Sequence, residues 1–190
     1  MGYAERLPRQ GISRSEMLKR VARFSDLKGF DGGHPDSLMP GCHRILYNVL
    51  GFQPPVGQTA GQTSPVGDDA ARGAAIKISE GFNLGFVRAK PGNGPMFHNH
   101  DTNETFVPMT GKWRAFWLDE SGKTESTDLG PYDVISFPPG VIRRFENISD
   151  GDPEMFDLML FVVAGDAPRG EFPLESVRQL QAAGLWPDKE

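Results

Sequence analysis

Two of the chain's four histidines stand one residue apart, in the stretch GNGPMFHNHDTNETFVPMTG between Gly92 and Gly111. His98 and His100 are followed four positions later by Glu104. Successive side chains on a β-strand alternate between its two faces, so both imidazoles are expected to project to the same side. Glu104 lies an even number of positions beyond them, and its carboxylate can approach the same point once the residues DTN have turned the chain.

Two neutral imidazole nitrogens and one carboxylate form a facial ligand set for Fe(II), and Mn, Ni, Co and Zn can use the same set. Positions on such a metal would remain open for a substrate and for oxygen. The spacing therefore predicts one divalent metal ion, with iron favoured, bound by His98, His100 and Glu104.

The residues around this cluster resemble a known pattern. Gly92, five residues, His98, one, His100, three, Glu104, six, Gly111 matches the first signature motif of the cupin superfamily position for position. The later stretch PPGVIRRFEN is similar to the second cupin motif, in which Pro-x-Gly precedes a histidine and then an asparagine. The resemblance covers about half of the chain, from Ile76 to Val163. It implies an all-β fold, the cupin double-stranded β-helix or jelly-roll barrel.

The family pattern also implies a third histidine ligand, and this chain has Arg143 at that position. A guanidinium stays protonated and carries only donors, so Arg143 cannot bind a metal. In one interpretation the metal stays on the other three residues, while Arg143 holds a substrate carboxylate or enolate by a forked hydrogen bond. In the other the metal is lost and Arg143 pairs with Glu104. Arg144 is expected to point outward, because strand neighbours face opposite sides.

A fold does not fix a function, and the resemblance leaves several classes open. The leading hypothesis is a mononuclear, metal-dependent, dioxygenase-like enzyme that oxygenates or isomerises a small anionic organic molecule, with Arg143 as a catalytic residue that compensates substrate charge. The alternative is a metal-free binding or regulatory cupin that uses Arg143 to hold an acid. A third hypothesis is an oligomeric structural protein without a ligand.

The elements that must position these residues follow from the pattern of apolar side chains. From residue 74 to residue 165 short runs rich in Phe, Val, Ile and Trp recur about every ten residues between turn signals, which predicts an antiparallel barrel. Residues 1–73 are interpreted as an amino-terminal arm and residues 166–190 as a carboxy-terminal helical segment. Helices are expected at residues 13–24 and 174–183, packed outside the barrel.

Two parts of the arm read less simply. The run CHRILYNVLGF, residues 42–52, is an apolar element of uncertain type. Residues 53–73 carry almost no large apolar side chains, so they predict a long loop that contributes nothing to the core.

Composition excludes several partners. Twenty basic and 25 acidic side chains give a formal charge of -5, and no Lys/Arg cluster is long enough to follow a nucleic acid backbone. The longest apolar run, LMLFVVAG, is too short to span a bilayer, and the amino terminus does not resemble a signal peptide. The single cysteine, Cys42, fits a reducing compartment. The sequence therefore predicts a cytoplasmic protein that binds neither nucleic acid nor membrane. A homodimer is also expected, because so small a barrel has apolar outer faces to cover.

Overall fold

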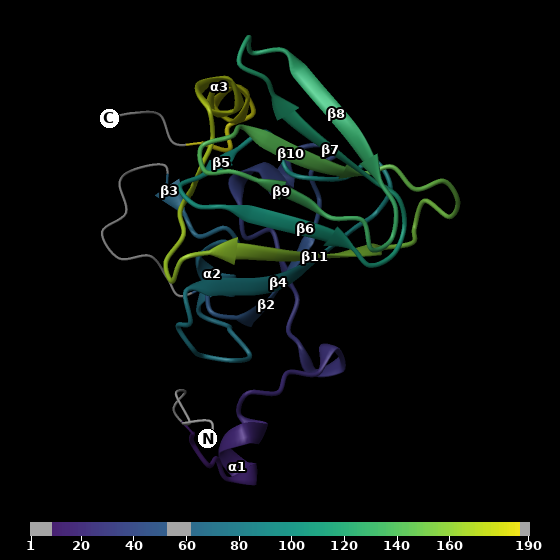
Figure 1. Cartoon of the computed structure of the whole chain (residues 1–190). Coiled ribbons are helices and arrows are strands. Elements are labelled where there is room, and N and C mark those ends of the chain that lie inside the picture. Colours follow the sequence, from purple (N-terminus) through teal and green to yellow (C-terminus); the bar gives the residue numbers. More distant parts are fainter. Residues whose placement is uncertain (1–8, 53–61, 187–190) are drawn as a thin grey trace, which may run out of the picture.

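The structure, a computed structural model, describes residues 9–52 and 62–186. Its named strands pair antiparallel and form three sheets, shown in Figure 1. The largest sheet has the order β1-β2-β4-β11-β6-β9. Its strands are β1 (Phe30–Asp31), β2 (Ile45–Leu50), β4 (Phe82–Ala89), β6 (Glu104–Pro108), β9 (Ile135–Phe137) and β11 (Asp157–Ala164).

Two smaller sheets complete the fold, with the orders β10-β7-β8 and β3-β12-β5. Their strands are β3 (Gln62–Thr63), β5 (Asn99–His100), β7 (Trp113–Leu118), β8 (Thr124–Leu129), β10 (Arg143–Asn147) and β12 (Gly170–Glu171). The helices and single turns are α1 (Arg14–Leu18), α2 (Asp68–Ala71), α3 (Leu174–Ala182), η1 (Phe24–Asp26) and η2 (Pro35–Leu38). The predicted all-β, antiparallel jelly-roll architecture is confirmed.

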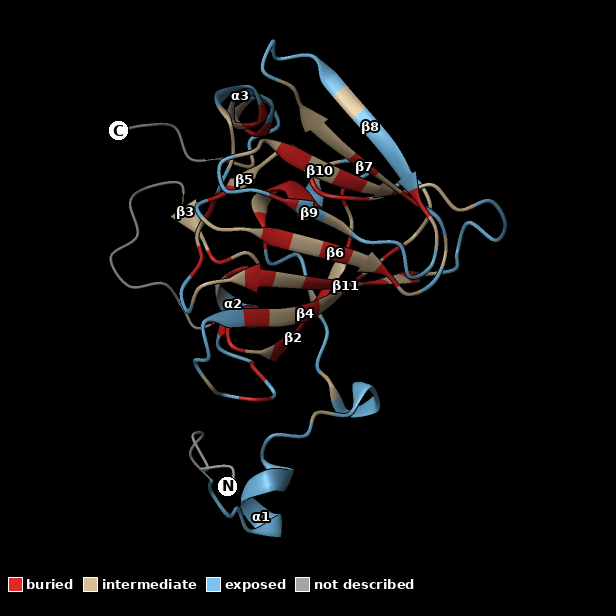
Figure 2. Ribbon diagram, in the orientation of Figure 1, coloured by how far each residue is buried: buried red, intermediate tan, exposed pale blue. Residues whose placement is uncertain are grey.

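The core lies between the six-stranded sheet and the β10-β7-β8 sheet. Strand β11 shows why its sequence forms a strand, because its residues alternate between buried and half-buried along its whole length. Phe161 of this strand belongs to one buried cluster with Phe106 of β6 and Phe145 of β10. The Phe106 and Phe145 rings meet at 5.1 Å between centroids. Figure 2 shows the resulting red and tan alternation on β4, β6 and β11.

The expected helix at residues 13–24 is much shorter in the structure. Helix α1 covers five residues and contains no buried residue. Ser13 caps its amino-terminal end, because the Ser13 hydroxyl accepts a hydrogen bond from the Glu16 amide. The helix extends away from the barrel in Figure 1 and does not pack against it. A short helix is only weakly stabilised by its own hydrogen bonds and needs a surface to pack against. Because α1 has no such surface, the helix does not continue to residue 24 as the apolar pattern predicts.

Residues before position 74 also contribute strands and core residues to the barrel. The element of uncertain type is strand β2, which pairs with β1 on one side and β4 on the other. Val66, Ala70 and Ala71 are fully buried in the main core, which corrects the prediction of a loop without core residues. Small side chains fill this space, and a search for large apolar residues overlooks them. Residues 53–61 of that predicted loop lie outside the described residues.

Helix α3 is the second predicted helix, and it packs on the barrel through Leu180, which is fully buried. Leu180 shares a small cluster with Cys42 and Met96. Burial raises the pKa of the Cys42 thiol above its ordinary value, in keeping with a structural cysteine. None of the helices among the described residues has the length and apolar character needed to cross a membrane.

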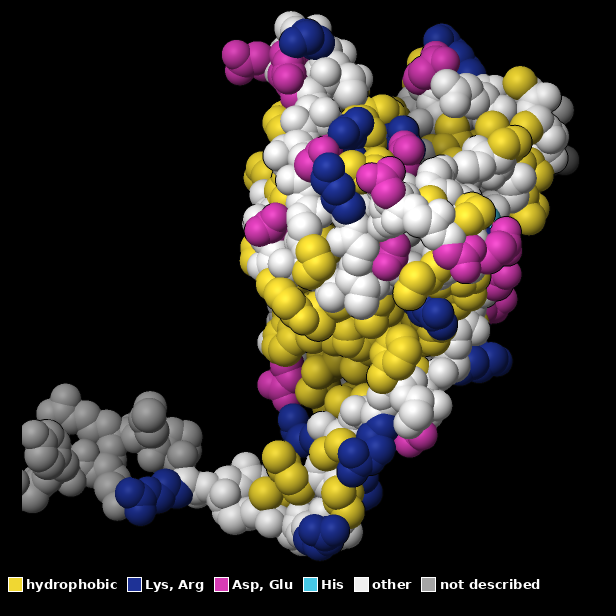
Figure 3. All heavy atoms as spheres, turned by 90° about the vertical axis from the view of Figure 1, so that its right-hand side faces the viewer, with side chains coloured by type: hydrophobic (Ala, Val, Ile, Leu, Met, Phe, Trp, Pro, Cys, Tyr) yellow, Lys and Arg dark blue, Asp and Glu magenta, His cyan; other side chains and the backbone are white. Residues whose placement is uncertain are grey.

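The outer face of the six-stranded sheet carries a row of apolar side chains. Tyr47, Phe86, Leu160 and Val107 are cross-strand partners on β2, β4, β11 and β6. Phe24 of the arm packs on this row, with its ring 5.4 Å from the rings of both Tyr47 and Phe86. Figure 3 shows a broad gathering of hydrophobic side chains above the arm on one face of the molecule.

Candidate metal centre and cavity

The three predicted ligand residues come together at one end of the barrel interior. His98 directly precedes β5, His100 ends that strand, and Glu104 begins β6. Their ligand atoms all lie within 4.8 Å of one another. The two imidazole rings are 5.2 Å apart and nearly perpendicular, at 85°. This group is the arrangement that the strand alternation predicts, and its chemistry suits one metal ion.

Backbone pairing fixes the two histidines. His98 exchanges two hydrogen bonds with Arg143, at 3.0 and 2.9 Å between amide nitrogen and carbonyl oxygen. His100 pairs with Gly170 of β12. A Cβ atom on Gly170 would lie 3.0 Å from Cε1 and 3.2 Å from Nδ1 of His100, so the absent side chain lets β12 pass directly over the imidazole.

Both imidazoles are oriented for metal binding by carbonyl oxygens. Nδ1 of His98 lies 2.9 Å from the Met96 carbonyl oxygen, and Nδ1 of His100 lies 3.0 Å from the Arg169 carbonyl oxygen. Because a carbonyl only accepts, each Nδ1 carries a proton, and Nε2 is the ring nitrogen left for a metal. Burial, followed by the nearby charge of Arg143, holds the pKa of His98 well below its usual range. His98 is therefore neutral at neutral pH, as a metal ligand must be.

Glu104 has a buried partner. Nη2 of Arg143 donates to Oε2 of Glu104 at 2.5 Å, and Nε2 of His100 lies 3.5 Å from the same oxygen. Burial raises the pKa of the Glu104 carboxyl and lowers the pKa of the Arg143 guanidinium, because both charges have lost their water. Since a guanidinium stays protonated in proteins, each group supplies the opposite charge that the other needs.

The side chain of Arg143 lies elsewhere than the interpretation in which it holds a substrate carboxylate would require. Its side chain is only 2% exposed and does not line the cavity beside the three ligand residues. Its Nη1 donates weakly to the His98 and Val141 carbonyl oxygens, at 3.4 and 3.5 Å, and its Nε has no partner among the described residues. Arg143 thus lies behind Glu104, outside the set of residues that line the cavity. Arg144, on the opposite face, is half-buried and lies over the Phe116 ring.

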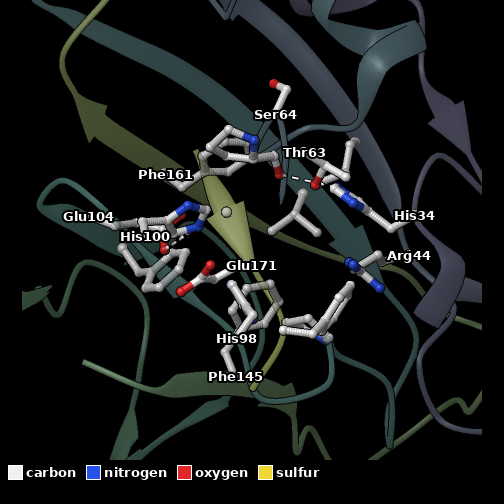
Figure 4. Close-up of a pocket in the computed structure, with 17 residues that line it drawn as sticks. His34, Arg44, Thr63, Ser64, His98, His100, Glu104, Phe145, Phe161 and Glu171 are labelled. Carbon is white, nitrogen blue, oxygen red and sulfur yellow. Dashed lines mark hydrogen bonds and ion pairs between the residues drawn. The ribbon is translucent and has the colours of Figure 1, made fainter. Parts of the chain in front are cut away.

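The cavity holds about 50 Å³. One side of it carries His100 and Glu104, and His34 and Arg44 lie across from them, as Figure 4 shows. Its wall is largely apolar, and the lining residues are His34, Arg44, Leu46, Thr63, Ser64, Pro65, Val87, Pro95, His98, His100, Glu104, Phe106, Phe145, Phe161, Gly170, Glu171 and Phe172.

Several lining residues come from outside the predicted barrel, and sequence reasoning did not assign them to the site. His34 does fold back to the cavity, but it does not belong to the three-residue group whose ligand atoms converge. For Arg44 a signal existed: it stands two positions before Leu46, so an extended chain places both on the same inward face. Thr63 and Glu171 belong to two-residue strands, which leave no periodic signal.

No protein-family model and no curated protein matches the sequence. Solved structures do match the fold, and the chain has the fold of the cupin superfamily. An oxalate oxidase matches with a TM-score of 0.51 and 13% identity, over 80% of this chain and 62% of the other. The oxalate decarboxylase of Lactobacillus farciminis, in its formate complex, matches at 0.52 and 12%, over 86% and 42%. A cupin-2 domain protein from Rhodospirillum rubrum matches at 0.52 and 12%, over 86% of both chains. The chain thus spans less than two thirds of the oxalate oxidase and less than half of the decarboxylase.

Proposed function

We propose that the protein is a metal-dependent cupin enzyme that acts on a small organic anion inside the barrel. The observation that carries this proposal is the convergence of His98, His100 and Glu104 on the cavity wall, with Nδ1 of each imidazole directed at a carbonyl oxygen. Two imidazoles and a carboxylate suit Fe(II) and also Mn, Ni, Co and Zn. When bound, such a metal polarises a substrate oxygen or activates dioxygen, which supports oxygenation or isomerisation.

The charges at the site favour an anionic substrate. His98 is neutral, and the negative charge of Glu104 is balanced by Arg143. Arg44 is paired with Asp36 in the same way. Glu171 also lines the cavity, but it is exposed to solvent, which screens its charge. A divalent ion would therefore add positive charge that the buried groups of the wall do not balance. A small anion would balance that charge.

The size of the cavity favours a small substrate. Because one water needs roughly 10–15 Å³ of this kind of space, a cavity of about 50 Å³ holds about three to five water-sized groups. Phe106, Phe145 and Phe161 line the cavity with apolar surface. A short organic acid fits these limits.

The direct test is metal analysis of protein that was purified without chelators or a polyhistidine tag. We expect about one divalent ion per chain after incubation with Fe(II), Mn(II), Ni(II) or Zn(II) and desalting, measured by plasma mass spectrometry. Retention of none of these metals would contradict the proposal. The second candidate, a metal-free cupin that binds a small acid, would then stand. The observation that favours it is the ion pair between Glu104 and Arg143, in which the two charges cancel without a metal.

We also propose that the protein is a homodimer that buries the outer face of the six-stranded sheet. The apolar row through Phe86 and Leu160 is only half-buried in one chain, and α1 leaves Met17 and Leu18 about half exposed. Within the described part of one chain, neither surface finds full cover. A second copy offers both surfaces in matching form, which is the symmetry of an isologous contact.

Light scattering should give twice the chain mass at micromolar concentration. Leu160→Arg places a charge in the centre of the face and is expected to yield a monomer that keeps the barrel. Ser126→Arg, on exposed strand β8, is the matched control and should remain dimeric. A wild-type monomer would contradict the proposal, as would a dimer that tolerates Leu160→Arg.

A further inference from the structure

Arg44 is a second buried arginine of the site, and it faces the cavity where Arg143 does not. It is 6% exposed and lines the cavity. Nη2 of Arg44 donates to Oδ1 of Asp36 at 2.9 Å, and Nη1 donates to the Cys42 carbonyl oxygen at 2.9 Å. The other oxygen of Asp36 accepts the Met96 amide at 2.9 Å. The contacts with Asp36 and the Cys42 carbonyl oxygen thus fix the position and the orientation of the guanidinium.

These contacts leave part of the guanidinium free. A guanidinium has five N–H donors in a rigid plane, and Arg44 uses two of them on partners among the described residues. Nε of Arg143 is sealed from solvent without a partner, whereas Nε of Arg44, which also donates to none of the described residues, is not sealed in this way. The Nε–H of Arg44 therefore has access to open space, and the cavity is the space that Arg44 lines.

We propose that Arg44 binds the carboxylate of the ligand, across the cavity from the metal residues His98, His100 and Glu104. In Figure 4 the guanidinium of Arg44 lies on the opposite side from His100 and Glu104. Arginine is suited to this role, since its planar donors match the two oxygens of a carboxylate. Asp36 compensates the charge of Arg44 while the cavity is without an anion, which makes a buried cation tolerable.

The placement defines a substrate class. The ligand carries a carboxylate at one end for Arg44 and, within the few atoms that the cavity allows, an oxygen at the other end for the metal. Short 2-hydroxy acids, 2-oxo acids and dicarboxylates have this form. The metal half of this assignment rests on the proposed function, whereas the contact between Arg44 and a carboxylate does not require the metal.

The test compares the affinities of wild type and Asp36→Asn/Arg44→Gln for glycolate, glyoxylate, oxalate and malonate by calorimetry, with and without metal. Removing both members of the pair leaves no unpaired buried charge. We expect the affinity for the acids that bind wild type to fall at least about tenfold in both forms, the usual effect of losing a hydrogen bond to a charged group. Glycolamide, an uncharged analogue of glycolate, should change by less than about threefold. The metal content should stay the same.

Arg114→Gln removes an arginine from an exposed ion pair with Asp128 and is the matched control, with unchanged affinities expected. If circular dichroism shows the double variant unfolded, Arg44→Lys replaces it, since Lys keeps the charge beside Asp36 but loses the planar fork. Unchanged acid affinity in the folded variant would overturn the proposal, as would a wild type that binds none of the four acids. If the wild type binds no metal, the proposed function is overturned but the role of Arg44 is not. The titrations without metal still test whether Arg44 binds the acids.

Discussion

Replacing Arg143 by Met is expected to lower the free energy of unfolding of the metal-free protein by about 3–5 kcal/mol, the usual cost of breaking a buried ion pair by removing one partner. The cause is Glu104, which is 4% exposed and would be left without a countercharge. Met has a similar length and apolar character, so little of the loss comes from packing. Urea unfolding followed by circular dichroism measures the change.

Two comparisons make this result specific. Arg144→Met removes the neighbouring arginine, whose half-exposed pair with Glu146 should contribute no more than about 1 kcal/mol. Glu104→Gln/Arg143→Met removes both buried charges and should recover most of the stability. Equal, small losses in Arg143→Met and Arg144→Met would show that the Glu104–Arg143 pair does not form.

Arg143→Met also tests whether Glu104 is a metal ligand as well as the ion-pair partner of Arg143. A divalent ion on Glu104 supplies the positive charge that Arg143→Met removes, and a ligand that binds only the folded state stabilises it. Metal is therefore expected to raise the melting temperature more in Arg143→Met than in wild type. An equal rise in both proteins would mean that the metal does not contact Glu104.

His100→Ala is expected to reduce the metal content from about one ion per chain to less than about a tenth of an ion. It removes one of only three ligands and leaves no substitute within the converging group. The barrel should stay folded at a cost of about 1–3 kcal/mol, because the Arg169 carbonyl oxygen loses its buried donor. Metal analysis and circular dichroism on the same preparation provide both measurements.

Two further histidines serve as controls. His43 is partly exposed and pairs with Asp31 far from the cluster, so His43→Ala should keep the metal. His34 lines the cavity without joining the converging group, so His34→Ala should keep it as well. Metal retained in His100→Ala but lost in His34→Ala would move the site to the other side of the cavity.

The barrel and the converging ligands could be predicted because their signals are local. The alternation of side-chain direction along strands such as β11 predicts which side chains face inward. The all-β fold that such strands predict is confirmed. The same rule places His98 and His100 on one side. The direction of Arg143 could also be anticipated, since it follows the alternation of β10.

The rest of the cavity depends on contacts between residues that are distant in sequence. Arg44 and Thr63 reach the cavity wall only because residues before the predicted barrel fold back onto it. Such a long-range contact leaves no periodic pattern in the sequence. The role of Arg143 was open for a related reason. Whether its guanidinium ends at the cavity or at Glu104 depends on a distance of a few ångströms, which strand alternation does not determine.

The passage of β12 over His100 has a consequence for how the centre is assembled during synthesis. The three candidate ligand residues leave the ribosome before Arg169, whose carbonyl oxygen orients His100 and lies 69 residues later in the chain. Gly170 then closes over the ring without a side chain. A nascent chain that ends at β11 would carry every ligand and still lack the group that fixes one of them. Tight uptake of the proposed metal would therefore depend on the docking of β12, separately from the formation of the barrel.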